Sequence, residues 1–162
     1  MAPQDFENLL AFLEETPEVI RLLTKNLPVT ELRRKPAKGQ FSFLEHVCHL
    51  RDIEQEGYTV RIARLLSEEQ PFLADIDGDI LAHERNYNSQ IFDEELSAFR
   101  RARKNNIQTI RPLPRENLKR IGILQNVGTI TLEQLLSMMR EHDNEHFRAL
   151  SDLRSQVTKR GS

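Results

Sequence analysis

Two histidines four residues apart, His142 and His146 in the segment EHDNEHFRAL, have the spacing that most directly suggests chemistry. One helical turn separates them, so both imidazoles project from the same side of a helix, at a separation that one metal ion can bridge. This spacing alone is weak evidence, because such a pair is often simply solvated or satisfied within a core. Both the metal interpretation and the structural interpretation stay open on these residues.

A second pair, His46 and His49, lies further up the chain. Helical periodicity places both on the inward side of another helix, together with Ile53 and Val60. Buried imidazoles need hydrogen-bond partners, so four inward histidines on two helices are unfavourable unless a ligand uses them. Three imidazoles would leave one coordination position open, which is typical of reactive metal sites. The periodicity does not decide whether His46 or His49 is the third ligand.

Carboxylates near the histidines are candidates for proton transfer. Glu54, Asp143 and Glu145 could each act as the base if the ion activates water. The letters HDNEH also match the H-x-x-E-H pattern of inverted zinc peptidases, whose glutamate activates water. That interpretation is disfavoured, because it needs a third ligand well downstream of His146, where few residues remain. Glu145 also points about 100° away from His146 around the helix.

Other candidate residues have weaker signals. In the segment AHERNYN, His83 has no partner at ligand spacing and is interpreted as a surface residue, whereas Arg85 and Tyr87 are candidates for lining a pocket mouth. Cys48 is the one cysteine, so the chain forms no internal disulfide and no cysteine-based zinc cluster. We expect Cys48 to be a small buried hydrophobic residue rather than a nucleophile.

Four long helical segments position these residues, and strand-like alternation is nearly absent. Two segments begin with a capping box, formed by Ser42 with Glu45 and by Thr131 with Gln134. The first predicted helix runs from about Phe6, capped by Asp5, to about Leu27, with a new start or kink at TPEV (16–19). The second runs from Ser42 to about Ser67. The third runs from a cap at Asp93 to before Pro112, and the fourth from Thr131 to about Val157. With two lengthy connectors and short extra helices, this pattern predicts an all-α, antiparallel four-helix bundle.

The composition indicates a single domain, residues 1–162, with ends at about 1–4 and 158–162 that we expect to fray. The 23 basic and 25 acidic residues nearly cancel, which argues against a nucleic-acid-binding face. The basic run RRARK at 100–104 is interpreted as a solvated helix face. No apolar run reaches the ~18 residues of a membrane span, and the N-terminus lacks the pattern of a secretory signal. The cytoplasm is therefore the expected location.

The segments FSFLEHVCHLRDIE (41–54) and TLEQLLSMMREHDNEHFRAL (131–150) resemble the DinB-like (DinB/YfiT) family of small metal-binding four-helix bundles. The segments EGYTVRI (56–62) and ERNYN (84–88) are similar to a subgroup of it. Carried over by position, the family's metal triad falls on His49, His142 and His146. The resemblance leaves His46 as a neighbour that either supports a ligand or is merely buried. Phe41 stands where many members have tryptophan, a departure that affects packing more than ligation.

The resemblance also implies a type of chemistry. Better-understood relatives use a divalent metal to activate a low-molecular-weight thiol, which is transferred to an electrophile or isomerised as an adduct. We therefore expect a metal-dependent thiol transferase acting on a small-molecule substrate. A hydrolase that uses metal-bound hydroxide is the alternative, and a non-catalytic metal-binding or structural bundle is the third.

The identity of the ion is not fixed by the sequence. Imidazole ligands favour zinc or nickel, with iron, manganese, cobalt or copper as further candidates. No membrane or nucleic-acid partner is expected, and a homodimer is an expectation drawn from the family and from the many apolar helix positions.

Overall fold

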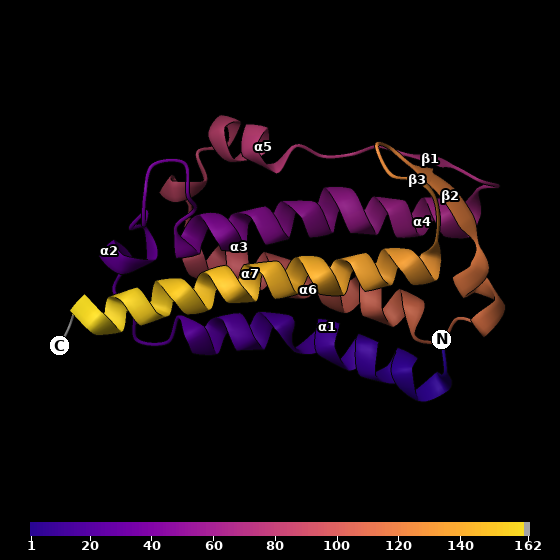
Figure 1. Ribbon diagram of the computed structural model, residues 1–162, viewed down its shortest axis with the longest axis horizontal. Helices are drawn as coiled ribbons and strands as arrows, with labels where there is room; N and C mark the ends of the chain where they lie inside the picture. Colours follow the sequence, from indigo (N-terminus) through magenta and orange to yellow (C-terminus); the bar gives the residue numbers. More distant parts are fainter. Residues whose placement is uncertain (161–162) are drawn as a thin grey trace.

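The computed structural model describes residues 1–160 and contains four long helical rods (Figure 1). The rods are α1 (Pro3–Leu23), a continuous stack of α3 (Phe43–Asp52), η1 (Ile53–Tyr58) and α4 (Thr59–Ser67), then α6 (Phe92–Ile110) and α7 (Leu132–Arg160). Short helices α2 (Val29–Leu32), α5 (Gly78–Glu84), η2 (Tyr87–Ser89) and η3 (Arg115–Lys119) lie in the connectors. The predicted helical bundle with long connectors and short extra helices is confirmed.

Two rods run in each direction along the bundle. In Figure 1, α3–α4 and α6 run one way, and α1 and α7 run the other way. The connector 68–91, which carries α5, returns the chain along the length of the second rod before α6 begins. As a result, α3 contacts α6 in parallel, and the antiparallel neighbours are α1 with α6 and α3 with α7.

The second rod starts as predicted but contains an unpredicted π-helix. Ser42 and Glu45 form the capping box, and the rod ends at Ser67. Between Asp52 and Thr59, the π-helix η1 has more residues per turn than an α-helix. The side chains after η1 are therefore rotated about the helix axis relative to those of an uninterrupted α-helix. The expectation that Val60 points inward is therefore wrong: Val60 is 47% exposed, and Ile62 is buried instead.

The first rod is one helix rather than two. It starts at Pro3 with Ala2 at the N-cap, so Asp5 lies in the first turn and is not the cap. The expected new start at residues 16–19 is wrong, because the helix continues through Pro17. A proline inside a helix lacks the N–H that would bond the carbonyl four residues earlier, here that of Leu13. Arg103 donates a hydrogen bond to that carbonyl instead, at 2.8 Å.

The other two rods differ from the prediction only at their ends. The helix α6 starts one residue before Asp93, with Ile91 as its N-cap. In α7 the predicted capping box is present, since the Thr131 backbone bonds Gln134 and the Gln134 backbone bonds Thr131. The helix α7 continues to Arg160, so residues 158–160 are helical rather than frayed, and the rest of that expected frayed end lies outside the described residues.

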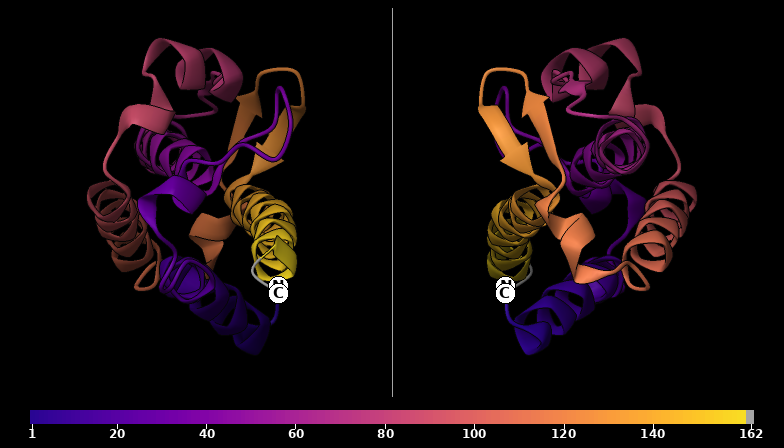
Figure 2. Two further views of the ribbon diagram at one scale, coloured as in Figure 1. Left: turned by 90° about the vertical axis from the view of Figure 1, so that its left-hand side faces the viewer. Right: turned by 90° about the vertical axis from the view of Figure 1, so that its right-hand side faces the viewer.

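A small three-stranded sheet covers one end of the bundle, where almost no strand was expected (Figures 1 and 2). Strand β2 (Ile121–Leu124) pairs in parallel with β1 (Phe72–Leu73) and antiparallel with β3 (Gly128–Thr131). Side chains along β2 alternate between exposed and buried. The letters IGIL and GTIT around a turn therefore did carry a hairpin signal, although a short one.

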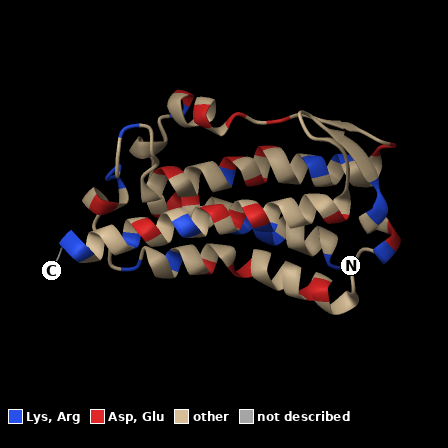
Figure 3. Ribbon diagram, viewed as in Figure 1, with Lys and Arg blue, Asp and Glu red and all other residues tan. Residues whose placement is uncertain are grey.

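The core contains a small cluster of Leu44, Cys48 and Tyr87 and two larger apolar clusters at opposite ends of the rods. One includes Leu9 and Leu13 of α1 and Leu135 of α7, and the other includes Ile20 of α1 and Leu150 of α7. Within residues 1–160, every helix is too short or too polar to span a bilayer. In the view of Figure 3, acidic and basic residues are interspersed along the rods. The stretch of α7 between the two clusters contains both of its histidines.

Candidate metal site

Three histidines from two neighbouring rods converge between the apolar clusters. His49 comes from α3, and His142 and His146 come from successive turns of α7. The Nε2 atom of His142 lies 3.1 Å from Nε2 of His49 and 3.2 Å from Nε2 of His146. One ligand atom from each residue lies within 4.8 Å of the other two, so these three histidines could hold a metal ion.

The separations fit a metal ion well. Two imidazole nitrogens bound to a tetrahedral zinc at 2.0–2.1 Å lie about 3.3 Å apart. The Nδ1 atoms of His49 and His142 are buried and have no hydrogen-bond partner within residues 1–160, so the hydrogen bonds between the rings do not satisfy the cluster. A cluster of this kind is more readily explained as a ligand set than as a core network, because buried polar atoms without partners are unfavourable.

Burial keeps these imidazoles neutral. Burial, with a smaller contribution from the nearby His49, lowers the pKa of His142 to about 4. Burial also lowers the pKa of His146 and of His49 below the ordinary histidine range. Neutral imidazole is the form that binds metals, so all three rings are in the metal-binding form at neutral pH.

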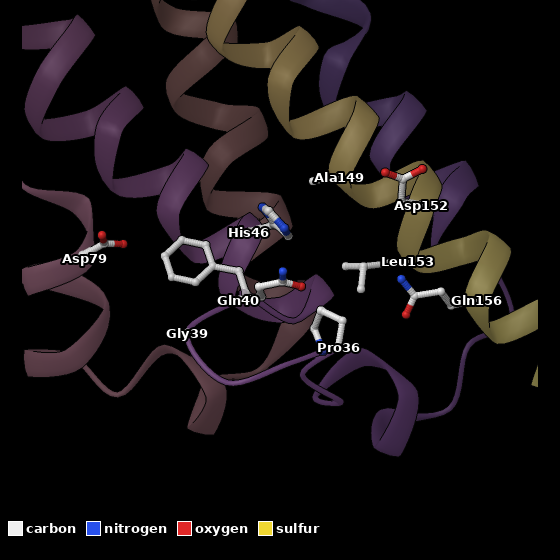
Figure 4. A pocket seen from close by; sticks show the side chains of 10 residues that line it. Pro36, Gly39, Gln40, His46, Asp79, Ala149, Asp152, Leu153 and Gln156 are labelled. Carbon is white, nitrogen blue, oxygen red and sulfur yellow. The ribbon is translucent and has the colours of Figure 1, made fainter.

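His46 contacts a ring of the cluster rather than simply filling space. Its Nδ1 lies 2.8 Å from Nδ1 of His146, which directs Nε2 of His146 toward the other two histidines. A hydrogen bond to the far nitrogen of this kind commonly fixes the orientation of a metal-binding histidine. His46 also lines a cavity of about 530 Å³, whose wall includes Asp79 and Asp152 (Figure 4).

Two of the three candidate bases are engaged elsewhere. Arg103 binds Asp143 at 2.7 Å and Glu54 at 2.9 Å, and all three side chains are buried. Asp143 also accepts a hydrogen bond from Thr16 at 2.7 Å, and Glu54 accepts one from Asn106 at 2.7 Å. These five residues form what we call the central polar layer. The layer leaves neither carboxylate free.

Glu145 is the candidate base that stays exposed. It has no ion pair within residues 1–160, and it lines a cavity of about 590 Å³ together with His142. Of the two cavities beside the histidines, this is the one that has a member of the triad in its wall.

Arg85 and Tyr87 bind a different residue, Asp52. Arg85 contacts Asp52 at 2.8 Å, and the Tyr87 hydroxyl donates to it at 2.6 Å. Tyr87 is fully buried and borders a separate cavity that His83 also lines, and His83 is exposed as expected. The structure therefore does not bring Arg85 or Tyr87 into contact with the three histidines.

Cys48 is fully buried, as expected for a small hydrophobic residue. Burial raises the pKa of its thiol to about 12, so the thiol is protonated at neutral pH. A protonated, buried thiol is not a nucleophile.

Three residues near the site were missed in the sequence. Arg103 is 1% exposed, so the interpretation of RRARK as a wholly solvated face is wrong at this position. A signal was present, because Arg103 follows Phe99 by four residues and precedes Ile107 by four, on the same helical stripe. Tyr58, whose ring centroid lies 6.1 Å from that of His142, and Gly78, which packs against His49, carry no comparable local signal.

Comparisons with known proteins agree with this architecture. The sequence profile described as the DinB superfamily matches residues 13–150. A search of curated proteins finds no match. A solved structure described as "YfiT from Bacillus subtilis is a probable metal-dependent hydrolase with an unusual four-helix bundle topology" superposes with a TM-score of 0.90 at 18% identity, covering 98% of this chain and 90% of that one.

Proposed function

The chain belongs to the DinB superfamily, and on this premise we propose that it is a metal-dependent enzyme that activates a small nucleophile, first of all a low-molecular-weight thiol. In this proposal His49, His142 and His146 hold one divalent ion, and the ion's open position receives the nucleophile. The observation that carries the proposal is the convergence of the Nε2 atoms of three buried or half-buried histidines at ligand separations.

The chain's own residues favour an activated, anionic nucleophile. A divalent ion held here would lower the pKa of a bound thiol or water and so supply a nucleophile at neutral pH. Three neutral imidazoles add no negative charge, so the positive charge of the site stays uncompensated and favours an anionic fourth ligand. Imidazole ligands suit zinc or nickel, and also iron, cobalt or copper.

Hydrolysis is the second candidate, and Glu145 is the observation that favours it. Glu145 is exposed, has no ion pair among the described residues, and lies in the wall of the same cavity as His142. A carboxylate in that position can accept the proton of a water molecule that attacks the substrate. The YfiT structure is itself described as a "probable metal-dependent hydrolase".

Metal content is the first test of the proposal. Wild type, His49→Ala and His142→Ala are purified without chelator or nickel affinity resin and analysed for elements. We expect stoichiometric metal in the wild type and loss of it in both variants. The exposed His83→Ala is the matched control and should keep the metal. Stoichiometric metal in the two triad variants would show that the ligand assignment is wrong. If the wild type takes up no added metal, the metal-dependent function is wrong and the remaining hypothesis is a non-catalytic structural bundle.

Thiol titration separates the two reactions. In the cobalt-substituted protein, a thiol that enters the open position changes the visible absorption spectrum. For thiol transfer we expect that change, together with conjugation to an electrophile that survives in Glu145→Gln. For hydrolysis we expect no spectral change with thiols, and ester cleavage that falls strongly in Glu145→Gln.

A further inference from the structure

The cavity that contains His142 has a defined chemical character. Its wall combines Tyr58 of η1, Val127 and Ile130 of the hairpin, and Met138 and Glu145 of α7. The wall also includes Gln134 and Ser137, but most of its exposed surface is apolar, so the cavity favours a molecule that has an apolar body. Because His142 is a proposed ligand of the ion, a molecule in this cavity would lie next to the reacting position.

The wall contains hydrogen-bond donors, among them the Tyr58 hydroxyl and the Gln134 amide. The Tyr58 hydroxyl has no hydrogen-bond partner within residues 1–160, although the side chain is only 6% exposed. Burial raises the pKa of this phenol, and the carboxylates of Asp143 and Glu54 raise it further. Tyr58 therefore stays protonated and can donate to a polar atom of a bound molecule.

The charged side chains in the wall of the cavity that contains His142 are acidic. Neither this cavity nor the one beside His46 has a lysine or an arginine in its wall. Glu141 also lines the cavity but is paired with Arg140 at 3.2 Å, whereas Glu145 has no ion pair among the described residues. In the metal-free protein, an anionic group placed in this cavity would approach Glu145 with no lysine or arginine among the described wall residues to offset its charge.

We propose that this cavity is the binding site of the organic substrate, and that the substrate is a neutral or cationic small molecule with an apolar body. Glu145 attracts a cationic group and repels an anionic one, and the Tyr58 hydroxyl donates to the substrate's polar atom. The proposal rests on the proposed function, because it takes the occupant to be the partner that the metal-activated nucleophile attacks.

Three probes of one shape test the selectivity. Trimethyl(2-phenylethyl)ammonium, 2-phenylethanol and 2-phenylethanesulfonate share an apolar body and differ in charge. The quaternary ammonium group cannot coordinate a metal, so its binding reports on the cavity itself. Titration calorimetry on metal-free protein in chelator should give an affinity for the cation at least about fivefold higher than for the sulfonate, as expected for one charge interaction near the surface. The alcohol should lie between the two.

Matched variants locate the effect. Glu145→Gln should abolish the preference for the cation. Asp152→Asn makes the same charge change on α7 but in the wall of the other cavity, and it should leave the preference intact. Val127 is 61% exposed, so Val127→Lys should not disturb folding and should shift the preference toward the sulfonate. Equal affinities for all three probes, binding of none, or an equal effect of Asp152→Asn and Glu145→Gln would overturn the proposal.

The same samples separate this proposal from the proposed function. Metal uptake is measured on the same preparations without chelator. A protein that shows the expected probe preference but takes up no metal contradicts the metal-dependent function alone. A protein that takes up metal but shows no probe preference when it is metal-free contradicts the cavity proposal alone.

Discussion

Two residues that supply no ligand atom, His46 and Gly78, hold two rings of the proposed metal site in place. His46 bonds the far nitrogen of His146. Gly78, at the start of α5, lies so close to His49 that a Cβ there would overlap the imidazole at Cε1 and Nδ1. The short helix α5 therefore acts as a wall behind the His49 ring, and the absence of a side chain at Gly78 is what lets the ring occupy its position.

Gly78→Ala should therefore weaken metal binding without removing a ligand. The added methyl group must displace the His49 ring or α5, and a shift of this kind in a supporting contact typically costs about tenfold or more in metal affinity. Competition against a chromophoric chelator measures the change. Gly57→Ala is the control, because a Cβ there would meet its nearest neighbour, Ile76, at an ordinary 3.4 Å. An unchanged metal affinity in Gly78→Ala would show that the His49 ring can shift away from the added methyl group and still bind the metal.

At the scale of the elements, the central polar layer fixes how the rods meet. Arg103 of α6 reaches the Leu13 carbonyl of α1, Glu54 of η1 and Asp143 of α7. Asp143 directly follows His142, so its ion pair with Arg103 also sets the rotation of α7 that turns the histidines inward. Pro17 contributes by leaving the Leu13 carbonyl without its helical partner.

Replacement of Arg103 by methionine should be strongly destabilising. The methionine keeps much of the volume but leaves two buried carboxylates without their cation, which typically costs about 3–5 kcal/mol in the free energy of unfolding. Urea unfolding of metal-free protein measures this value. The exposed neighbour Arg101 provides the control, and Arg101→Met should change stability by less than about 0.5 kcal/mol. A small effect at Arg103 would mean that the carboxylates find other partners.

The sequence was sufficient for features that depend on local patterns. Both capping boxes are confirmed, because each is formed by side chains three residues apart that bond nearby backbone. The spacing paired His142 with His146 and left His46 and His49 open as the third residue, and the family resemblance pointed to His49. The structure brings His49, His142 and His146 together. Whether they bind a metal stays a prediction.

Features that depend on contacts between distant segments were not predictable in the same way. Arg103 looked solvated because its partners, Glu54 and Asp143, lie about forty to fifty residues away. The π-helix η1 changes which side chains of the second rod face inward after it, and no residue type between 53 and 58 predicts a π-helix. Strand β1 has two residues and exists only because it pairs with β2, which lies almost fifty positions later.

At the scale of the whole molecule, four buried or half-buried histidines lie at the middle of the bundle, between two apolar clusters. Burial lowers the pKa of His46 and of His142 from 6.5 to about 4 and also lowers the pKa of His49 and His146. The unfolded chain therefore binds protons below pH 6.5 that the folded protein does not bind. The stability due to these groups is fully present above that pH and is lost as the pH falls toward 4.

Metal-free protein should accordingly lose stability steeply between pH 6.5 and 4. Each such histidine contributes up to ~1.4 kcal/mol per pH unit to the slope of the unfolding free energy. Urea unfolding in chelator across this range should give a smaller slope for His142→Gln than for wild type. The exposed His83→Gln should retain the wild-type slope. Equal slopes in all three proteins would mean that the buried rings are protonated before the chain unfolds.

The sealed position of Cys48 has a practical consequence for a protein proposed to handle thiols and electrophiles. The chain has one cysteine, and its thiol lies in the core with no exposed surface. The folded protein is thus protected from alkylation by a reactive substrate and from mixed disulfides with a small thiol. Consumption of thiol in an assay can then be assigned to the reaction with the substrate rather than to modification of Cys48. A maleimide dye that labels the chain reports only molecules that have unfolded, locally or globally.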